Sequence, residues 1–126
     1  MNEKKIILLV EDEAPAALAL QGALTHHGFE VLVAEDGEKG LALAKEKHPD
    51  LILTDLKMPK MGGMEMIAEL RKDEWGKDVE VIILTNMSEV EMLEKAMENK
   101  AFFYIIKGDS SMADIVSKVE LRLQKR

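Results

Sequence analysis

Short apolar runs alternate along this chain with longer segments in which apolar residues recur at every third or fourth position. The runs have the length and makeup of strands, and the segments between them have the spacing of helices that bury one face. The central run, Leu51–Thr54, has the apolar, partly β-branched character of a strand buried on both sides. Five strands are predicted, at Lys5–Val10, Glu30–Ala34, Leu51–Thr54, Val79–Leu84 and Ala101–Ile106.

Strict alternation of strands and helices is typical of a parallel sheet with helices packed on both of its faces. The pattern therefore predicts an α/β fold with a doubly wound, five-stranded parallel sheet and five helices. In the first of these helices we expect the buried face to contain Leu18, Leu20 and Leu24, with the alanines between them.

Local signals mark the starts of three helices. The first helix is expected to start near Pro15, because proline suits the first helical turn. Ser88 with Glu91 has the spacing of a capping box and predicts the start of the fourth helix. Ser110 or Ser111 can cap the fifth helix.

Length and composition narrow the class of protein. The chain has 126 residues, which we interpret as one domain over residues 1–126 with no output domain after the fifth helix. It contains no cysteine, so disulfides and thiolate metal sites are excluded. The net charge of −7 argues against nucleic-acid binding and favours partners with basic patches. Neither a membrane span nor a signal peptide is predicted, so we expect a cytoplasmic protein.

Polar side chains stand where four of the five predicted strands end. The first strand ends in Glu11 and Asp12, the third in Asp55, the fourth in Thr85 and the fifth in Lys107. In a parallel sheet these strand ends lie on one edge, so the side chains should meet there. Three carboxylates at one edge favour a hard divalent cation, with Mg²⁺ as the expected ion. A lysine and a hydroxyl nearby could hold phosphoryl oxygens, with one aspartate as the nucleophile.

Four sequence motifs, LLVEDE, DLKMPKMGG, VIILT and YIIK, occur in this order along the chain. With them the chain resembles a response-regulator receiver domain of two-component signalling, a stand-alone CheY-like receiver, from Lys4 to about Arg126. The resemblance implies a flavodoxin-like sheet with the strand order 2-1-3-4-5. It also implies a signalling role and not that of an enzyme, beyond assisting the domain's own phosphorylation and dephosphorylation.

The resemblance assigns roles to the polar strand ends. Asp55 would be the phosphoacceptor, and Glu11 and Asp12 would form the acidic pair. Mg²⁺ would be bound by Glu11, Asp12, Asp55 and the backbone carbonyl of Lys57. The phosphoryl group would come from a histidine kinase or a phosphotransfer protein.

Three further residues would change position in response to that phosphoryl group. Thr85 would be the switch hydroxyl, Lys107 would pair with the phosphoryl group, and the ring of Tyr104 would reorient with Thr85. The altered surface would comprise the fourth helix, fifth strand and fifth helix. Its partner would be an unknown downstream protein or a second copy of the chain, forming a homodimer.

The chain departs from the family pattern at three places. Gly108 stands where a proline usually follows the lysine, which predicts a more flexible loop. Asn86 replaces a small residue after the switch hydroxyl, and its side chain would either narrow phosphoryl access or add a hydrogen bond. Lys100-Ala101 replaces Gly-Ala, so Asn99 is expected to take the left-handed position.

Other functions fit parts of this pattern. A Mg²⁺-dependent phosphatase with Asp55 as nucleophile is one alternative, and an interaction module that is never phosphorylated is another. A flavodoxin-like cofactor carrier is disfavoured because no phosphate-binding loop rich in Ser, Thr and Gly follows the first strand. Glu11 and Asp12 could also be a solvated first turn, Thr85 a helix cap, and Tyr104 a core aromatic.

Overall fold

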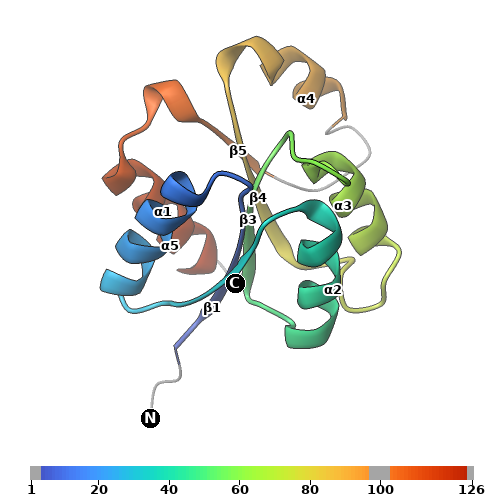
Figure 1. Cartoon of the computed structure of the whole chain (residues 1–126), viewed down its shortest axis with the longest axis horizontal. Helices are drawn as coiled ribbons and strands as arrows, with labels where there is room; N and C mark the ends of the chain where they lie inside the picture. The colour runs from blue at the N-terminus through green and yellow to red at the C-terminus, as the bar shows by residue number, and fades with distance from the viewer. Residues whose placement is uncertain (1–3, 97–102, 125–126) are drawn as a thin grey trace.

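The computed structural model describes residues 4–96 and 103–124. Its strands form a single parallel sheet in the order β2-β1-β3-β4-β5, which confirms the predicted topology (Figure 1). The central strand, β3, is buried along its whole length, as its apolar composition predicts. The strands are β1 (Ile6–Val10), β2 (Glu30–Ala34), β3 (Leu51–Asp55), β4 (Glu80–Thr85) and β5 (Phe103–Ile106).

Helices cover both faces of the sheet (Figure 1). In the described residues, five α-helices follow the five strands in turn, and two 3₁₀ turns occur near the carboxyl edge. None of the described helices has the length and apolar character needed to cross a membrane. The helical elements are α1 (Ala14–His26), α2 (Gly37–Lys47), α3 (Gly63–Arg71), η1 (Met87–Glu89), α4 (Val90–Ala96), η3 (Lys107–Asp109) and α5 (Met112–Gln124).

The core consists of two apolar clusters, one on each face of the sheet. Successive residues of a strand point to opposite faces, so Ile7 lies in one cluster and Leu8 in the other. Helices α1 and α5 pack in the cluster that contains Ile7, whereas α2, α3 and α4 contribute to the cluster that contains Leu8. Each helix therefore buries one apolar stripe against the sheet and leaves the carboxyl edge free for polar side chains.

Capping interactions confirm one predicted helix start. At the start of α5, the backbone N–H of Asp114 donates to Ser111 Oγ at 3.1 Å, and the Ser111 N–H donates to Asp114 Oδ2 at 3.0 Å. This reciprocal pair is a capping box, so Ser111 is the capping serine of the two predicted. Pro15 lies in the first turn of α1, as predicted.

Two expectations about helices are wrong. The side chain of Leu18 is 70% exposed, because the buried stripe of α1 runs through Ala17, Leu20 and Leu24 instead. Ser88 does not cap α4, since it lies inside the 3₁₀ turn η1, and its Oγ donates to Asn86 Oδ1 at 2.6 Å. The expectations for residues 97–102, which include Asn99 and Lys100-Ala101, lie outside the described residues.

The loop after β3 is held in place by two glycines with no room for a side chain. A Cβ on Gly63 would lie 2.5 Å from the carbonyl oxygen of Asp55, and one on Gly37 would lie 2.1 Å from that of Met61. The N–H of Gly37 donates to this Met61 oxygen at 3.0 Å. The start of α2 therefore holds the loop after β3, which contains Lys57, against the carboxyl edge of the sheet.

Candidate functional site

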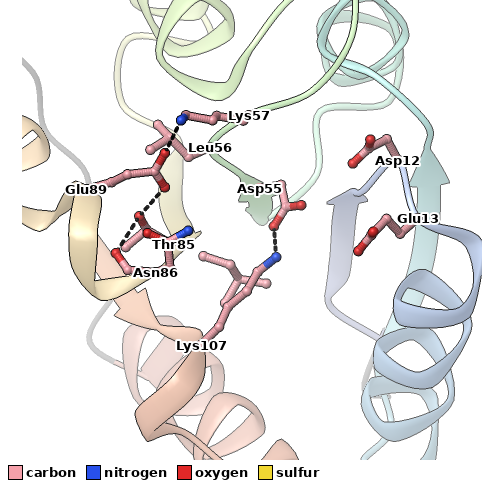
Figure 2. Close-up of a pocket in the computed structure, with 10 residues that line it drawn as sticks. Asp12, Glu13, Asp55, Leu56, Lys57, Thr85, Asn86, Glu89 and Lys107 are labelled. Atoms are coloured by element: carbon pink, nitrogen blue, oxygen red, sulfur yellow. Dashed lines mark hydrogen bonds and ion pairs between the residues drawn. The ribbon is translucent and has the colours of Figure 1, made fainter.

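A polar cavity of about 250 Å³ opens at the carboxyl edge of the sheet (Figure 2). Its walls come from the ends of β1, β3 and β4 and from the turn that follows β5. The cavity is therefore located where the pattern of polar strand ends predicts a site. The side chains that define its chemistry are Asp12, Asp55, Lys57, Thr85, Glu89 and Lys107.

Asp55 lies at the centre of this cavity. It is the last residue of β3 and is only 7% exposed. Lys107 Nζ lies 2.5 Å from Asp55 Oδ1, and this oxygen accepts no well-oriented hydrogen bond from the described residues. A buried carboxylate oxygen that is held by an ion pair and by no hydrogen bond can still bind a further cation or attack an electrophile.

Glu11 and Asp12 bring two more carboxylates to Asp55. One oxygen from each of the three residues lies within 4.8 Å of the other two. Glu11 and Asp55 are buried, whereas Asp12 is exposed, so one of the three carboxylates is open to solvent. Burial, followed by the nearby Asp55 carboxylate, raises the pKa of Glu11 to about 7. Three hard oxygen donors at this spacing fit a small divalent cation such as Mg²⁺.

Lys107 faces the same carboxylates from the end of β5. Its Nζ is 3.9 Å from Glu11 Oε1 in addition to its close contact with Asp55. Burial by itself would lower the pKa of Lys107, but the Asp55 and Glu11 carboxylates outweigh burial and raise that pKa above its usual value. The ammonium therefore stays charged. The neighbouring Gly108 lies in η3, and a Cβ there would have open space around it.

Thr85 has its hydroxyl on a different side of the cavity from Lys107. The hydroxyl lies 3.2 Å from the carbonyl oxygen of Asn86 and 3.4 Å from Glu89 Oε1. Asn86 lines the cavity, and its side-chain oxygen accepts the hydrogen bond from Ser88. The departure at Asn86 therefore adds a hydrogen bond between the residue before η1 and Ser88 inside that turn.

Glu89 was not predicted as a site residue. Its Oε2 lies 2.7 Å from Lys57 Nζ, and its side chain is only 12% exposed (Figure 2). The turn η1 brings this carboxylate back to the cavity from four positions after Thr85. The one signal in the sequence is an acidic residue one helical turn after a strand-end hydroxyl, and such a signal is common in helix starts.

Tyr104 is half-buried on β5, packed against the cluster that contains Leu8. Its hydroxyl donates to Glu94 Oε2 on α4 at 2.8 Å. This hydrogen bond raises the pKa of Tyr104, because a carboxylate acceptor favours the protonated phenol. The structure thus places the tyrosine between β5 and α4, and outside the group of side chains around Asp55.

A parallel sheet of this order, with three carboxylates and a lysine at its carboxyl edge, defines an α/β domain with a charged site at the edge where such sheets bind ligands. A model of the response regulator receiver domain family matches residues 7–120, so the chain belongs to that family. It is therefore a receiver domain of two-component response regulators.

Two curated relatives of the chain are named as transcriptional regulators. A probable transcriptional regulator, ycf27, of Porphyridium aerugineum is 39% identical over 105 residues, which is 83% of this chain and 42% of that protein. The phosphate regulon transcriptional regulatory protein PhoB of Pseudomonas aeruginosa is 34% identical over 96% of this chain and 52% of its own length. The chain thus spans about half or less of the length of these two regulators.

Solved structures agree on the fold. A CheY-like receiver domain protein of Methanospirillum hungatei JF-1 has a TM-score of 0.87 at 26% identity, covering 98% of this chain and 96% of that one. The receiver domain of a sensor histidine kinase of Pseudomonas aeruginosa PAO1 has a TM-score of 0.80 at 26% identity, covering 98% of this chain and 97% of that one. In that protein a magnesium ion is coordinated in the active-site cleft.

Proposed function

We propose that this receiver domain accepts a phosphoryl group on Asp55 and thereby changes the surface that it offers to a partner. The single observation that carries the proposal is the pairing of the buried Asp55 carboxylate with Lys107 at 2.5 Å, beside two more carboxylates. A structural aspartate needs one charge partner, whereas this group has the charges required for phosphoryl transfer.

The donor in this proposal is a phosphohistidine of a histidine kinase or a phosphotransfer protein. A carboxylate oxygen of Asp55 attacks the phosphorus, the bond between phosphorus and the imidazole nitrogen breaks, and the histidine leaves with that electron pair. The product is an acyl phosphate on Asp55. Lys107 remains charged beside Asp55 and can stabilise the equatorial oxygens of the transferred group.

Mg²⁺ fits the acidic group of the cavity. Glu11, Asp12 and Asp55 supply oxygen donors within 4.8 Å of one another, and the carbonyl of Lys57 is the proposed backbone ligand. When bound, the ion would offset the negative charge that builds up during phosphoryl transfer. The magnesium ion in the histidine kinase receiver of Pseudomonas aeruginosa supports this assignment.

The proposed output surface comprises α4, β5 and α5. Thr85 and Lys107 would bind the new phosphoryl oxygens, and Tyr104 would change its contact with α4. These elements expose large apolar side chains at Met92, Phe103 and Leu121, which is the kind of surface that a protein partner covers. The partner is a downstream protein or a second copy of the chain, and the regulators among its relatives support the former.

The test is the intact mass of the protein after incubation with Mg²⁺ and acetyl phosphate as the phosphodonor. We expect a gain of one phosphoryl group that is released by hydroxylamine and prevented by chelating Mg²⁺ beforehand. The Asp55→Asn protein should show no gain, whereas Asp78→Asn, an exposed aspartate in the loop after α3, should gain as the parent does.

Two results would contradict the proposal. One is a phosphoryl group on a residue other than Asp55. The other is a folded protein that gains nothing from acetyl phosphate or from phosphorylated histidine kinases. Release of many equivalents of phosphate from small esters, with no phosphoryl group retained on the protein, would favour the phosphatase alternative instead.

A further inference from the structure

One carboxylate, Glu89, links two residues at the wall of the cavity. Its Oε1 lies 3.4 Å from the hydroxyl of Thr85, and its Oε2 lies 2.7 Å from the ammonium of Lys57. Figure 2 shows this chain of contacts from Lys57 through Glu89 to Thr85, on the side of Asp55 away from Asp12. Glu89 thus connects the hydroxyl at the end of β4 with the loop after β3.

The burial of the Glu89 carboxylate ties it to its two partners. Its side chain is 12% exposed, whereas that of Lys57 is 80% exposed. A carboxylate removed from water in this way needs charged or hydrogen-bonding partners, and Lys57 and Thr85 are the partners that the structure provides. The turn η1 follows Thr85 after one residue and fixes the backbone of Glu89. The Glu89 carboxylate is therefore held close to the Thr85 hydroxyl.

The Thr85 hydroxyl has a single hydrogen, so it donates to one acceptor at a time. In the structure its acceptors are Glu89 and the carbonyl of Asn86. A phosphoryl group on Asp55 would be a third and more strongly charged acceptor in the same cavity of about 250 Å³. The negative charges of Glu89 and a phosphoryl group also repel each other there. The contact between Thr85 and Glu89 therefore belongs to the unphosphorylated state.

We propose that Glu89 is a positioning residue that holds the Thr85 hydroxyl in its unphosphorylated orientation and so opposes the switch. This inference rests on the proposed function of Asp55. A residue that stabilises one of two states shifts their populations by the energy of its differential contact. Removing Glu89 should therefore favour the state in which Thr85 binds the phosphoryl group.

The test uses beryllofluoride with Mg²⁺ as a stable probe of the phosphorylated state, and measures its affinity by titration calorimetry. We expect Glu89→Ala to tighten beryllofluoride binding about fivefold, the effect of losing one hydrogen bond made only in the free state. Glu89→Gln removes the charge but retains an oxygen acceptor for Thr85, so it should tighten beryllofluoride binding less than Glu89→Ala does. The methyl resonance of Thr85 in free Glu89→Ala should also move towards its position in the beryllofluoride complex.

Two control variants separate this role from a general effect of charge. Glu13→Ala removes a carboxylate that lines the same cavity on its other side, so it reports the effect of charge alone. In a Thr85→Val background, Glu89→Ala should no longer tighten binding, because the hydroxyl is absent. Equal tightening in Glu13→Ala, or tightening that persists with Thr85→Val, would overturn the inference.

Failure of the inference and failure of the proposed function give different results. Binding of beryllofluoride to the parent but not to Asp55→Asn supports the proposed function, whatever the Glu89 variants do. Absence of binding to the folded parent would contradict the proposed function and the role of Glu89 with it.

Discussion

The Lys107 ammonium lies 2.5 Å from a carboxylate oxygen of Asp55, although Asp55 ends β3, Lys107 follows β5, and β4 lies between these two strands in the sheet. The ammonium thus occupies a position where a cation held by Glu11 and Asp12 would share Asp55 with it. If Asp55 is the phosphoacceptor proposed above, Lys107 would have two opposed effects: it would compete with a metal ion for Asp55, and it would stabilise a phosphoryl group there.

Replacing Lys107 by methionine should separate these two effects. We expect Lys107→Met to tighten Mg²⁺ binding about fivefold. The variant removes one competing positive charge, whose repulsion of the ion is worth about 1 kcal/mol. The same variant should take up the phosphoryl group from acetyl phosphate more slowly by a factor on the order of a hundred. Calorimetry measures the first effect, and a time course of intact mass measures the second.

Lys39→Met is the control for the Lys107 variant. Lys39 is exposed and paired with Glu35 on the surface, so its removal changes the net charge by the same amount away from the cavity. Both measurements should stay within about twofold of the parent. Weaker Mg²⁺ binding in Lys107→Met would contradict the competition described here.

A second prediction concerns the loop that carries Lys57. Gly37→Ala should destabilise the protein by about 1–3 kcal/mol, because its Cβ would clash with the carbonyl oxygen of Met61. Gly22→Ala should stabilise it by up to about 1 kcal/mol, since Gly22 lies in α1 with open space around it. Urea denaturation measures both, and Gly37→Ala without loss of stability would show that the loop moves freely.

The pKa shift of Asp114 makes stability depend on pH at acidic values. The Ser111 backbone N–H, followed by its hydroxyl, lowers the pKa of Asp114 in the folded protein. The carboxylate therefore stabilises the fold above its unfolded pKa of about 4, and that contribution is lost as the pH falls through the folded pKa. The urea midpoints of Asp114→Asn and of the parent should thus differ most at pH 7 and least near pH 3.

Variants of neighbouring residues test whether the cap is responsible. Ser111→Ala should cost about 1 kcal/mol at pH 7, the usual effect of losing a serine cap. Glu120→Gln removes a carboxylate from the same helix outside its first turn, and its difference from the parent should not follow the pattern of Asp114→Asn.

The single tyrosine of the chain permits a direct test of the contact between β5 and α4. Because Glu94 raises the pKa of Tyr104, Glu94→Gln should shift the tyrosine titration to lower pH. Phenolate absorbance over the pH range in which circular dichroism shows a folded protein measures this shift. An unchanged titration would mean that the hydrogen bond to Glu94 is not maintained in solution.

The fold follows from the sequence because the apolar runs that predict strands also determine their burial. Leu51–Asp55 is buried throughout, as expected for the centre of a parallel sheet. The face of α1 was harder to predict, since Leu18 is next to Ala17 and a leucine is normally the better candidate for the core. The spacing of three and four residues places Ala17 on the same face as Leu20 and Leu24 and turns Leu18 towards solvent, so the helical period outweighed the apolar character of Leu18.

The side chains around Asp55 were predictable for a similar reason: parallel strands bring their carboxyl ends to one edge. Glu11, Asp12, Thr85 and Lys107 all lie there. Glu89 was missed because the capping pattern of Ser88 predicts a regular α-helix start. The chain forms a 3₁₀ turn at that point instead, and this tighter turn brings the Glu89 carboxylate back to the cavity.

The division of the core by the sheet has a practical consequence for measuring the signal state. Helix α1 packs in one apolar cluster and α4 in the other, so a rearrangement of α4 can occur without repacking the contacts of α1. A dye attached to the exposed Thr25, near the C-terminal end of α1, should then give a constant signal, while a dye on the exposed Met92 should respond if α4 moves on phosphorylation as proposed. If Asp55 is phosphorylated as proposed, the domain with these two dyes would act as a ratiometric biosensor of that modification.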